Sequence, residues 1–447
     1  MKQDLTTGNI TKSMLFFAFP MIAGNMLQQL YNVADTLIVG KFLGSDALAA
    51  VGSAYTLMTF LTSILLGLCM GSGAVFSIRF GERNEKILKE SIFVSFVLIG
   101  TLAIVLNAAV IVWIDPILRL LQVPDEVTGM MREYLVVIFM GIFATFLYNY
   151  FASLLRAIGN SVVPLLFLAV SSLLNIGLDL LFVLVFHRGI AGAAEATIIS
   201  QYVSGIGIVC YTYIRFPQLR IEKQHMHMKK EIFHEISQFS FLTCIQQSVM
   251  NFGILMVQGL VNSFGPVVMA AFAAAVKIDS FAYMPVQDFG NAFSTFIAQN
   301  YGAKKEDRIR KGIRVAIITA VIFCLIISAG VFIFAKDLML IFVQPQETEI
   351  LRVGVQYLRV EGMFYCGIGC LFLLYGLYRA VQKPGMSVVL TIISLGTRVL
   401  LAYTLSSIPE IGVLGIWWSV PIGWFLADVT GLVYLWKNSK IISTHFK

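Results

Sequence analysis

Long apolar stretches recur along this chain and constrain its fold more than any other feature. A helix needs about 20 predominantly apolar residues to cross the hydrocarbon core of a bilayer, and twelve stretches meet that length. They are continuous rather than alternating and too long for the strands of a membrane barrel, so they predict helices. The stretches lie at about 14–38, 47–77, 91–114, 132–154, 162–186, 190–213, 232–262, 267–299, 312–335, 353–380, 385–408 and 412–435.

The scarcity of charge excludes an ordinary soluble protein. Charged residues make up 13% of the 447 residues, whereas soluble domains carry about 25%. The first apolar stretch is too long for a signal peptide and lacks a small-residue cleavage site, so we expect it to be a true span. Proline removes a backbone donor from a helix, and four prolines are therefore predicted bend points: Pro20, Pro266, Pro285 and Pro421.

Basic residues are unevenly distributed between the two sides of these spans. If the N-terminus is cytoplasmic, most Lys and Arg residues fall in cytoplasmic segments, including clusters at 79–89, 215–230 and 304–314. Because cytoplasmic loops carry an excess of Lys and Arg, we predict a multi-pass protein of the cell inner (plasma) membrane with both termini in the cytoplasm.

The spans lack the motifs that carry enzymatic chemistry. The six cysteines lie in apolar stretches without a CxxC pair, which indicates small core residues rather than disulfides or a metal site. The five histidines lie outside the span centres, and no HExxH or phosphate-binding GxxxxGK[ST] stretch occurs. We therefore expect no enzyme, no cofactor, no nucleic-acid partner and no direct use of ATP, so that energy comes from an ion gradient.

The chain repeats itself at a spacing of about 220 residues. GSDALAAVGSAYTLMTF from Gly44 is similar to GPVVMAAFAAAVKIDSF from Gly265, and RFGERNEK from Arg79 matches NYGAKKED from Asn300. Each match is weak by itself, but their shared order and nearly constant offset indicate a duplication. Further matching pairs are Gln28 with Gln246, Gly81 with Gly302, and Tyr134 with Tyr357.

Six spans in each half mean that both halves enter the membrane in the same direction. We predict an all-α integral membrane protein with twelve transmembrane helices in two pseudosymmetric six-helix lobes. The N-terminal lobe comprises 1–214, a cytoplasmic inter-lobe loop 215–231, and the C-terminal lobe 232–447. Repeats of this kind are typical of secondary transporters, which alternate access by rocking one lobe against the other around a central site.

A polar stripe interrupts the first apolar stretch. Its spacing of three and four residues puts its members on one helix face, with Tyr31 beside them. A charge at the bilayer centre costs about 2.5–3.5 kcal/mol on insertion scales, so this face must look into the bundle or a wet cavity. The members of the stripe are Asn25, Gln28, Asn32 and Asp35.

A second acidic site is predicted in the fifth span. Asn175 and Asp179 are four residues apart and share a helix face, and Thr197 in the sixth span can add a hydroxyl. Oxygen ligands of this kind suit Na⁺, while two acids held close also suit H⁺ binding. The alternative interpretation is that the acids only hydrogen-bond neighbours and fasten helices together.

The duplication favours a functional interpretation of these acids. In the second half, Asp35 aligns with Gly253, and Asp179 aligns with Ala402. We therefore expect a buried acidic cluster in the N-terminal lobe only, whereas a purely architectural pair would be present in both. Glu195, in the sixth span, has no interpretation from its position alone.

Two segments resemble known transporters. FPMIAGNMLQQLYNVADTLIVGKFLGSDALAAVG, from Phe19, is similar to the first span of the multidrug and toxic compound extrusion (MATE) family. AAFAAAVKIDSF with MPVQDFGNAFSTFIAQNYGA is similar to its eighth span. The likeness extends over the whole chain. It implies an antiporter that expels cationic, amphipathic compounds in exchange for H⁺ or Na⁺.

Within the family, the DinF-like branch binds its coupling ion in the N-terminal lobe. Asp35, Asn175, Asp179 and Thr197 match the cation-binding positions of that branch, and the first three would be the metal ligands if the ion is Na⁺. Another branch uses acids in spans seven and ten, where this chain has only Glu361. We expect a monomer in the bilayer whose partners are small organic cations and the coupling ion.

The same resemblance implies a substrate pocket in which carboxylates and aromatic or methionine surfaces receive flat cations. The alternative to drug export is a flippase or exporter of lipid-linked sugars, which would need a cationic cavity; only Lys277 and Arg398 lie within the spans. The candidate substrate-binding residues are Gln28, Tyr31, Asn32, Asn149, Gln247, Met256 and Gln258.

Overall fold

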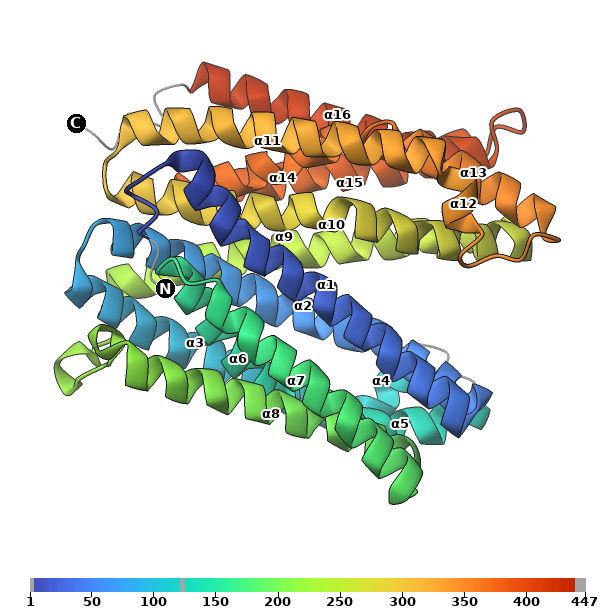
Figure 1. The fold of residues 1–447 in the computed structure, drawn as a ribbon, viewed down its shortest axis with the longest axis horizontal. Coiled ribbons are helices and arrows are strands. Elements are labelled where there is room, and N and C mark those ends of the chain that lie inside the picture. Colours follow the sequence, from blue (N-terminus) through green and yellow to red (C-terminus); the bar gives the residue numbers. More distant parts are fainter. Residues whose placement is uncertain (1–3, 121–124, 439–447) are drawn as a thin grey trace. The chain divides into compact units, whose positions relative to one another are not determined.

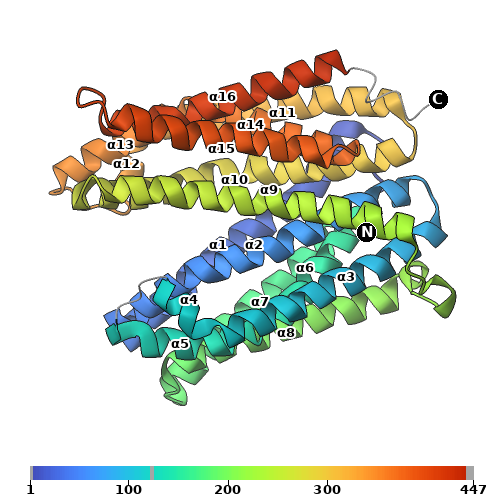
Figure 2. The same cartoon turned by 180° about the vertical axis from the view of Figure 1, so that it is seen from behind.

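The computed structural model describes residues 4–120 and 125–438. Within these ranges every regular element is a helix, which confirms the predicted all-α class. The outer limits of the predicted lobes, residues 1 and 447, lie outside the described residues. Figures 1 and 2 show the helices from opposite sides.

The chain packs into two units of similar size. The first contains Ala23–Cys244, and the second contains Leu5–Ile22 together with the chain from Ile245 onward. Two long helices are therefore divided between the units, α1 (Ile10–Leu43) and α9 (Lys230–Asn262). The lobe boundaries at 214 and 232 stay a prediction.

In the first unit, α2 packs against α3, α5 and α6. Helix α6 packs against α2 and α8, and α7 packs against α8. Its remaining elements are α2 (Ser45–Gly81), α3 (Glu85–Val112), α4 (Ile114–Leu120), α5 (Asp125–Phe139), α6 (Ile142–Ala157), α7 (Val162–Leu180), the π-helical turn η1 (Leu181–Val185), α8 (Gly189–Arg215), and the short 3₁₀ turns η2 (Pro217–Leu219) and η3 (Lys223–His225).

The second unit repeats this arrangement with its own helices. Helix α10 packs against α11, α13 and α14, and α15 packs along α16. Its elements after α9 are α10 (Pro266–Gly302), α11 (Glu306–Ile333), α12 (Ala335–Met339), α13 (Thr348–Gly362), α14 (Tyr365–Ala380), α15 (Pro384–Ser406) and α16 (Val413–Lys437).

Ten helices of the described chain are long and apolar enough to cross a membrane, and two bent pairs bring the total to twelve. The pairs are α5 with α6, bent by 46°, and α13 with α14, bent by 51°. They fall on the predicted spans 132–154 and 353–380, which occupy equivalent places in the two halves. A multi-pass membrane architecture follows.

Proline does not mark these two breaks. Helices α1, α10 and α16 run on through Pro20, Pro285 and Pro421. The predicted bend at Pro266 is wrong, because this residue begins α10, where the missing N–H has no helical partner to lose.

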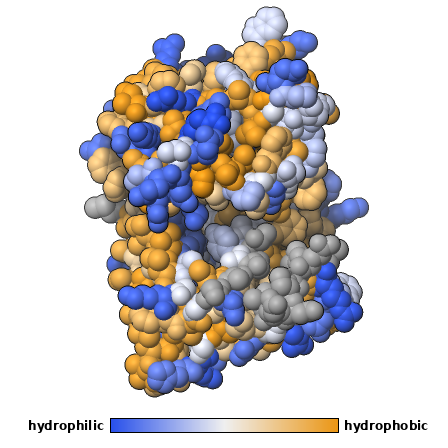
Figure 3. All heavy atoms as spheres, turned by 90° about the vertical axis from the view of Figure 1, so that its right-hand side faces the viewer, coloured by the Kyte–Doolittle hydropathy of each residue, from blue (hydrophilic) through white to orange (hydrophobic). Residues whose placement is uncertain are grey.

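Apolar side chains form much of the outer surface, as expected where lipid is the solvent. Helix α11 alone exposes Ile318, Ile322, Leu325 and Ile326, each by half or more of its surface. Figure 3 shows apolar residues over large parts of one face. Since lipid tails are as apolar as leucine, close backbone packing rather than hydrophobic burial must hold such helices together.

Glycine provides such packing where α2 meets the first part of α9. A Cβ added to Gly67 would lie 2.6 Å from Cα of Cys244 and 3.0 Å from its backbone nitrogen. Backbone atoms cannot move aside as a flexible side chain can, so this contact requires glycine.

Alanine substitution should separate this packing role from helix propensity. Gly67→Ala should destabilise the protein by about 1–3 kcal/mol through overpacking, measured as a lower thermal unfolding midpoint in detergent. Gly52→Ala on the same helix meets nothing within 4 Å and should be neutral or stabilising, because alanine favours helices over glycine. Equal midpoints for the two variants would contradict the close contact.

Candidate functional site

Asp35, from the polar stripe of α1, meets Asp179 of α7 inside the first unit. Asp35 and Asp179 lie within hydrogen-bonding reach of each other through their carboxyl groups. Asp179 is fully buried. One oxygen of each carboxylate, Oδ1 in both cases, is buried and has no hydrogen-bond partner among the residues that the structure describes. The site therefore holds two acids in contact and two oxygens available to a ligand.

Helices α7 and α8 position the neighbours of Asp179. Asn175 lies one helical turn before it and is 1% exposed. Exchanging the oxygen and nitrogen positions of the Asn175 amide gives both atoms a partner. In this orientation Nδ2 donates to Asp179 Oδ2 at 2.9 Å, and Oδ1 accepts from Thr197 Oγ1 at 3.1 Å. The structure thus brings together all four residues predicted to bind the coupling ion, Asp35, Asn175, Asp179 and Thr197.

The end of α7 is irregular at this point. Immediately after Leu180 the helix passes into the π-helical turn η1. Such turns are rare within helices and occur frequently at functional sites. Here the turn begins two residues after Asp179.

Two tyrosines complete the cluster. The Tyr31 hydroxyl lies within hydrogen-bonding reach of Thr197 and close to both acids. Tyr134, on α5, is 3% exposed and also close to Asp35 and Asp179. Sequence reasoning missed Tyr134 as a site residue, although its match with Tyr357 across the duplication was a usable signal.

The oxygen donors fit either candidate ion. Two carboxylates, an amide oxygen and a hydroxyl are hard ligands of the kind that alkali cations take, and two carboxyl groups in contact repel unless a proton or a cation lies between them. Among the described residues, no group of three or more His, Cys, Asp or Glu side chains could hold a metal ion. A Na⁺ ion here would thus depend on Asn175 and Thr197 as well as on the acids.

The residues predicted to bind substrate are divided between the units. Gln28, Tyr31 and Asn32 lie on α1 and Asn149 lies on α6, all in the first unit; Asn149 Nδ2 donates to the carbonyl of Thr145 at 2.8 Å. The second part of α9, which belongs to the second unit, carries the other predicted residues, Gln247, Met256 and Gln258.

Glu195 has a plain role in the structure. Its carboxylate forms an ion pair with Arg188 at 2.8 Å, and both side chains are partly exposed. The pair joins two residues near the beginning of α8.

The second unit has a buried acidic cluster of its own, so the expectation of acids in one lobe only is wrong. Tyr365 Oη donates to Asp279 Oδ1 at 2.7 Å, and Tyr357 Oη donates to Oδ2 at 3.4 Å. Glu361 is 1% exposed and within hydrogen-bonding reach of Asp279. Arg398, on α15, supplies a nearby positive charge.

The prediction failed because it compared equivalent positions only. Asp279 and Tyr365 are 86 residues apart in the chain, and no spacing pattern links them. The two clusters also differ in charge, because an arginine accompanies the acids in the second unit, whereas the acids of the first unit have amide, hydroxyl and tyrosine neighbours.

Comparison with known proteins identifies the family. The family model MatE matches residues 20–181 and 240–404. The chain is similar to the probable multidrug resistance protein YpnP of Bacillus subtilis, with 31% identity over 88% of this chain and 87% of that protein. It is also similar to the probable multidrug resistance protein NorM of Thermotoga maritima, with 25% identity over 91% and 88% of the two chains.

Solved structures agree on the fold. An outward-facing multidrug resistance MATE family transporter of the MOP superfamily superposes with a TM-score of 0.92 at 23% identity, covering 98% of each chain. A MOP superfamily transporter from Pyrococcus furiosus gives 0.91 at 24% identity, covering 99% of this chain and 98% of that one.

Removal of one hydroxyl should test the network around Asp179. Thr197→Val deprives the buried Asn175 amide of a partner, which costs about 1–3 kcal/mol, and should lower the thermal unfolding midpoint in detergent. Thr212→Val on the same helix removes a hydroxyl that bonds only the Ile208 carbonyl of its own helix and should change the midpoint much less. Equal losses would show that the Thr197 hydroxyl contributes nothing specific.

Proposed function

The chain belongs to the MatE family of membrane transporters and is not an enzyme, and from this premise we propose that it is a secondary active antiporter. It exports cationic, amphipathic compounds in exchange for H⁺ or Na⁺ by alternating access. The observation that supports this proposal most directly is the contact between the Asp35 and Asp179 carboxyl groups inside the first unit.

Charge balance explains why such a pair can couple two cations. Two ionised carboxylates in a membrane interior strongly favour an entering positive charge. Once H⁺ or Na⁺ is bound, the pair attracts an organic cation less. Each ligand thereby weakens the binding of the other, and this reciprocal coupling is what exchange requires.

The substrate class follows from the relatives and from the residues predicted to bind it. Several relatives are named as multidrug resistance or multidrug export proteins. Aromatic faces and methionine side chains, as at Tyr31 and Met256, suit flat organic cations. The names do not favour the alternative of lipid-linked sugar transport, which would also need positive charge to hold a pyrophosphate.

Orientation and assembly belong to the same proposal. The distribution of Lys and Arg supports an inner (plasma) membrane protein with both termini in the cytoplasm. The lobes at 1–214 and 232–447, joined by the loop 215–231, rock against each other as a monomer to open the site to alternate sides.

Neutralising either acid should uncouple transport. Asp35→Asn and Asp179→Asn keep the size of the side chain but remove its charge, so both variants should insert and accumulate normally. Efflux of ethidium from cells or proteoliposomes should fall at least tenfold. Glu195→Gln is the matched control, because it removes an acid of the same unit that pairs with Arg188, and should export normally. Normal export by both Asp variants would end the coupling proposal.

Imposed gradients should identify the ion. Purified protein in liposomes should move ethidium against its gradient when the gradient of the coupling ion is imposed. A pH gradient and a Na⁺ gradient should therefore differ in how strongly they drive transport. If the ion is Na⁺, Thr197→Val should raise the Na⁺ concentration needed for half-maximal transport, because it removes an oxygen from the site. If the ion is H⁺, the Thr197→Val variant should need the same pH gradient as the wild type for half-maximal transport. Transport with neither gradient would exclude antiport with these ions.

A further inference from the structure

A hollow in the second unit lies outside every site described above. It has a volume of about 490 Å³ and is lined by the segment Gly8–Thr11 on one side and by the first three turns of α11 on the other. The basic cluster at 304–314 supplies much of this lining.

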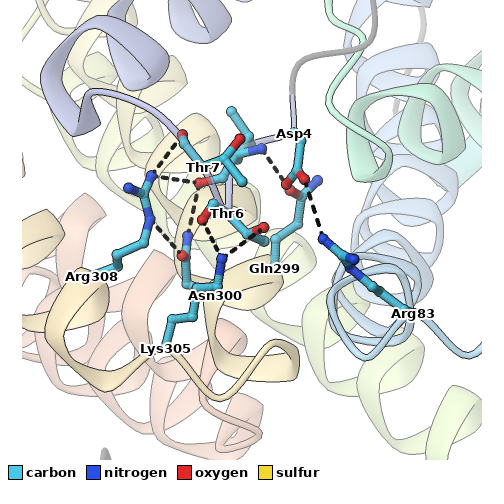
Figure 4. Close-up of polar contacts among 9 residues, drawn as sticks. Asp4, Thr6, Thr7, Arg83, Gln299, Asn300, Lys305 and Arg308 are labelled. Carbon is cyan, nitrogen blue, oxygen red and sulfur yellow. Dashed lines mark hydrogen bonds and ion pairs between the residues drawn. The ribbon is translucent and has the colours of Figure 1, made fainter.

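Polar contacts within the second unit anchor the residues that lead into the wall Gly8–Thr11 (Figure 4). Asn300 is fully buried and donates to the carbonyl of Leu5 at 3.1 Å. Arg308 donates to the carbonyls of Gly8 at 2.7 Å and Thr7 at 3.0 Å, and Lys305 donates to that of Thr6 at 2.7 Å. These bonds hold the segment before α1 against α11, so the hollow is a built feature rather than a gap beside a loose tail.

The opposite wall is positively charged. Arg308, Lys311 and Arg314 follow one another at intervals of three residues on α11 and line the hollow, with Asp307 as the one acid of the lining. Arg310, which does not line it, pairs with Glu306 at 2.5 Å. Within the described part of the chain, neither Lys311 nor Arg314 forms an ion pair.

The duplicated half shows what occupies the equivalent place. The offset that matches Gly81 with Gly302 also matches Glu90 with Lys311. Glu90 is 1% exposed and accepts from Lys229 Nζ at 2.7 and 2.8 Å. Lys229 directly precedes α9. In a similar way, the lining segment Gly8–Thr11 contains the two residues before α1 and the first two residues of α1.

The side chains at this position therefore carry opposite charges in the two units. In the first, an acid on the third span binds a cation that the chain itself supplies at the start of α9. In the second, a lysine replaces the acid, and the start of α1 supplies Asn9 and Thr11 but no carboxylate. The start of α1 thus offers no carboxylate to pair with Lys311, whereas the first unit has a complete ion pair between Glu90 and Lys229.

We propose that this hollow binds a phosphate-type anion, held by Lys311 and Arg314 against the start of α1. Arginine and lysine are the usual partners of phosphate oxygens. Two sources share this chemistry, the headgroup of an anionic phospholipid and free inorganic phosphate. Basic pockets between transmembrane helices on the cytoplasmic side are known to bind such headgroups. The inference is independent of the proposed ion coupling.

Binding should be measured on the purified full-length protein in neutral detergent. Phosphatidylglycerol, phosphatidylcholine, sodium phosphate and sodium chloride are titrated at equal ionic strength, and the thermal unfolding midpoint and lipid retention in native mass spectrometry are recorded. A headgroup site predicts that phosphatidylglycerol raises the midpoint and stays bound while phosphatidylcholine does neither. A free-phosphate site predicts that sodium phosphate raises the midpoint at concentrations where chloride does not, and that phosphatidylglycerol adds nothing.

Substitutions locate the site. Lys311→Gln and Arg314→Gln should each weaken binding of the active anion about fivefold, the effect of one basic residue near a charged headgroup. Lys304→Gln, in the same cluster but outside the hollow, should leave affinity unchanged. The double variant Thr11→Lys with Lys311→Glu rebuilds the ion pair of the first unit. It should fold with a midpoint at or above that of the wild type and no longer respond to the anion.

The proposal fails if wild type responds equally to phosphatidylglycerol and phosphatidylcholine and equally to phosphate and chloride. It also fails if Lys311→Gln and Arg314→Gln bind the active anion as tightly as Lys304→Gln does. Because none of these variants alters Asp35 or Asp179, loss of anion binding with intact ethidium export distinguishes this site from the proposed coupling site.

Discussion

A charge inside a lipid bilayer must find its compensation within the protein, and this constraint governs both units. A carboxylate at the bilayer centre costs about 2.5–3.5 kcal/mol even on the mildest scales. The first unit meets that cost with the amide of Asn175, the hydroxyl of Thr197 and two nearby tyrosines. The second unit surrounds Asp279 with tyrosine hydroxyls and Arg398. Compensation by neutral groups leaves the first cluster with two negative charges when both acids are ionised, whereas Arg398 offsets one of the two in the second cluster, so the first cluster attracts a cation more strongly.

The duplication explains both what the units share and where they differ. Tyr134 and Tyr357 occupy matching positions, and each faces the acids of its own unit. Glu90 and Lys311 also match, yet they carry opposite charges. At these two pairs of positions the duplication therefore preserved a polar residue but not the sign of its charge. Functional asymmetry can arise in this way without any change of backbone.

Local spacing predicted a large part of this molecule. The apolar stretches gave the spans, and the interval between Asn175 and Asp179 put both on one helix face, where the structure has them. The contact between Asp35 and Asp179 could be predicted from the sequence because both acids interrupt apolar stretches. An acid that interrupts such a stretch needs a partner inside the bundle. The two bent spans were not foreseen, because their breaks follow Phe139 and Gly362 without a proline.

Sequence reasoning failed where partners come from distant helices with no shared period. The cluster around Asp279 draws on α10, α13, α14 and α15, and each member taken alone is an ordinary isolated polar residue. Alignment of the two halves was misleading here, since the acids of the second unit do not occupy the positions of the first. Such sites are defined by tertiary packing, which no spacing rule encodes.

The division of α1 and α9 between the units has a consequence for the origin of the chain. Each unit contains the first part of the helix that otherwise belongs to the other, Leu5–Ile22 in one case and the part of α9 before Ile245 in the other. A protein cut at residue 220 would yield two fragments, each missing a piece of its own bundle. A single-length precursor with the same division would have to exchange these pieces with a second copy of itself to complete both bundles.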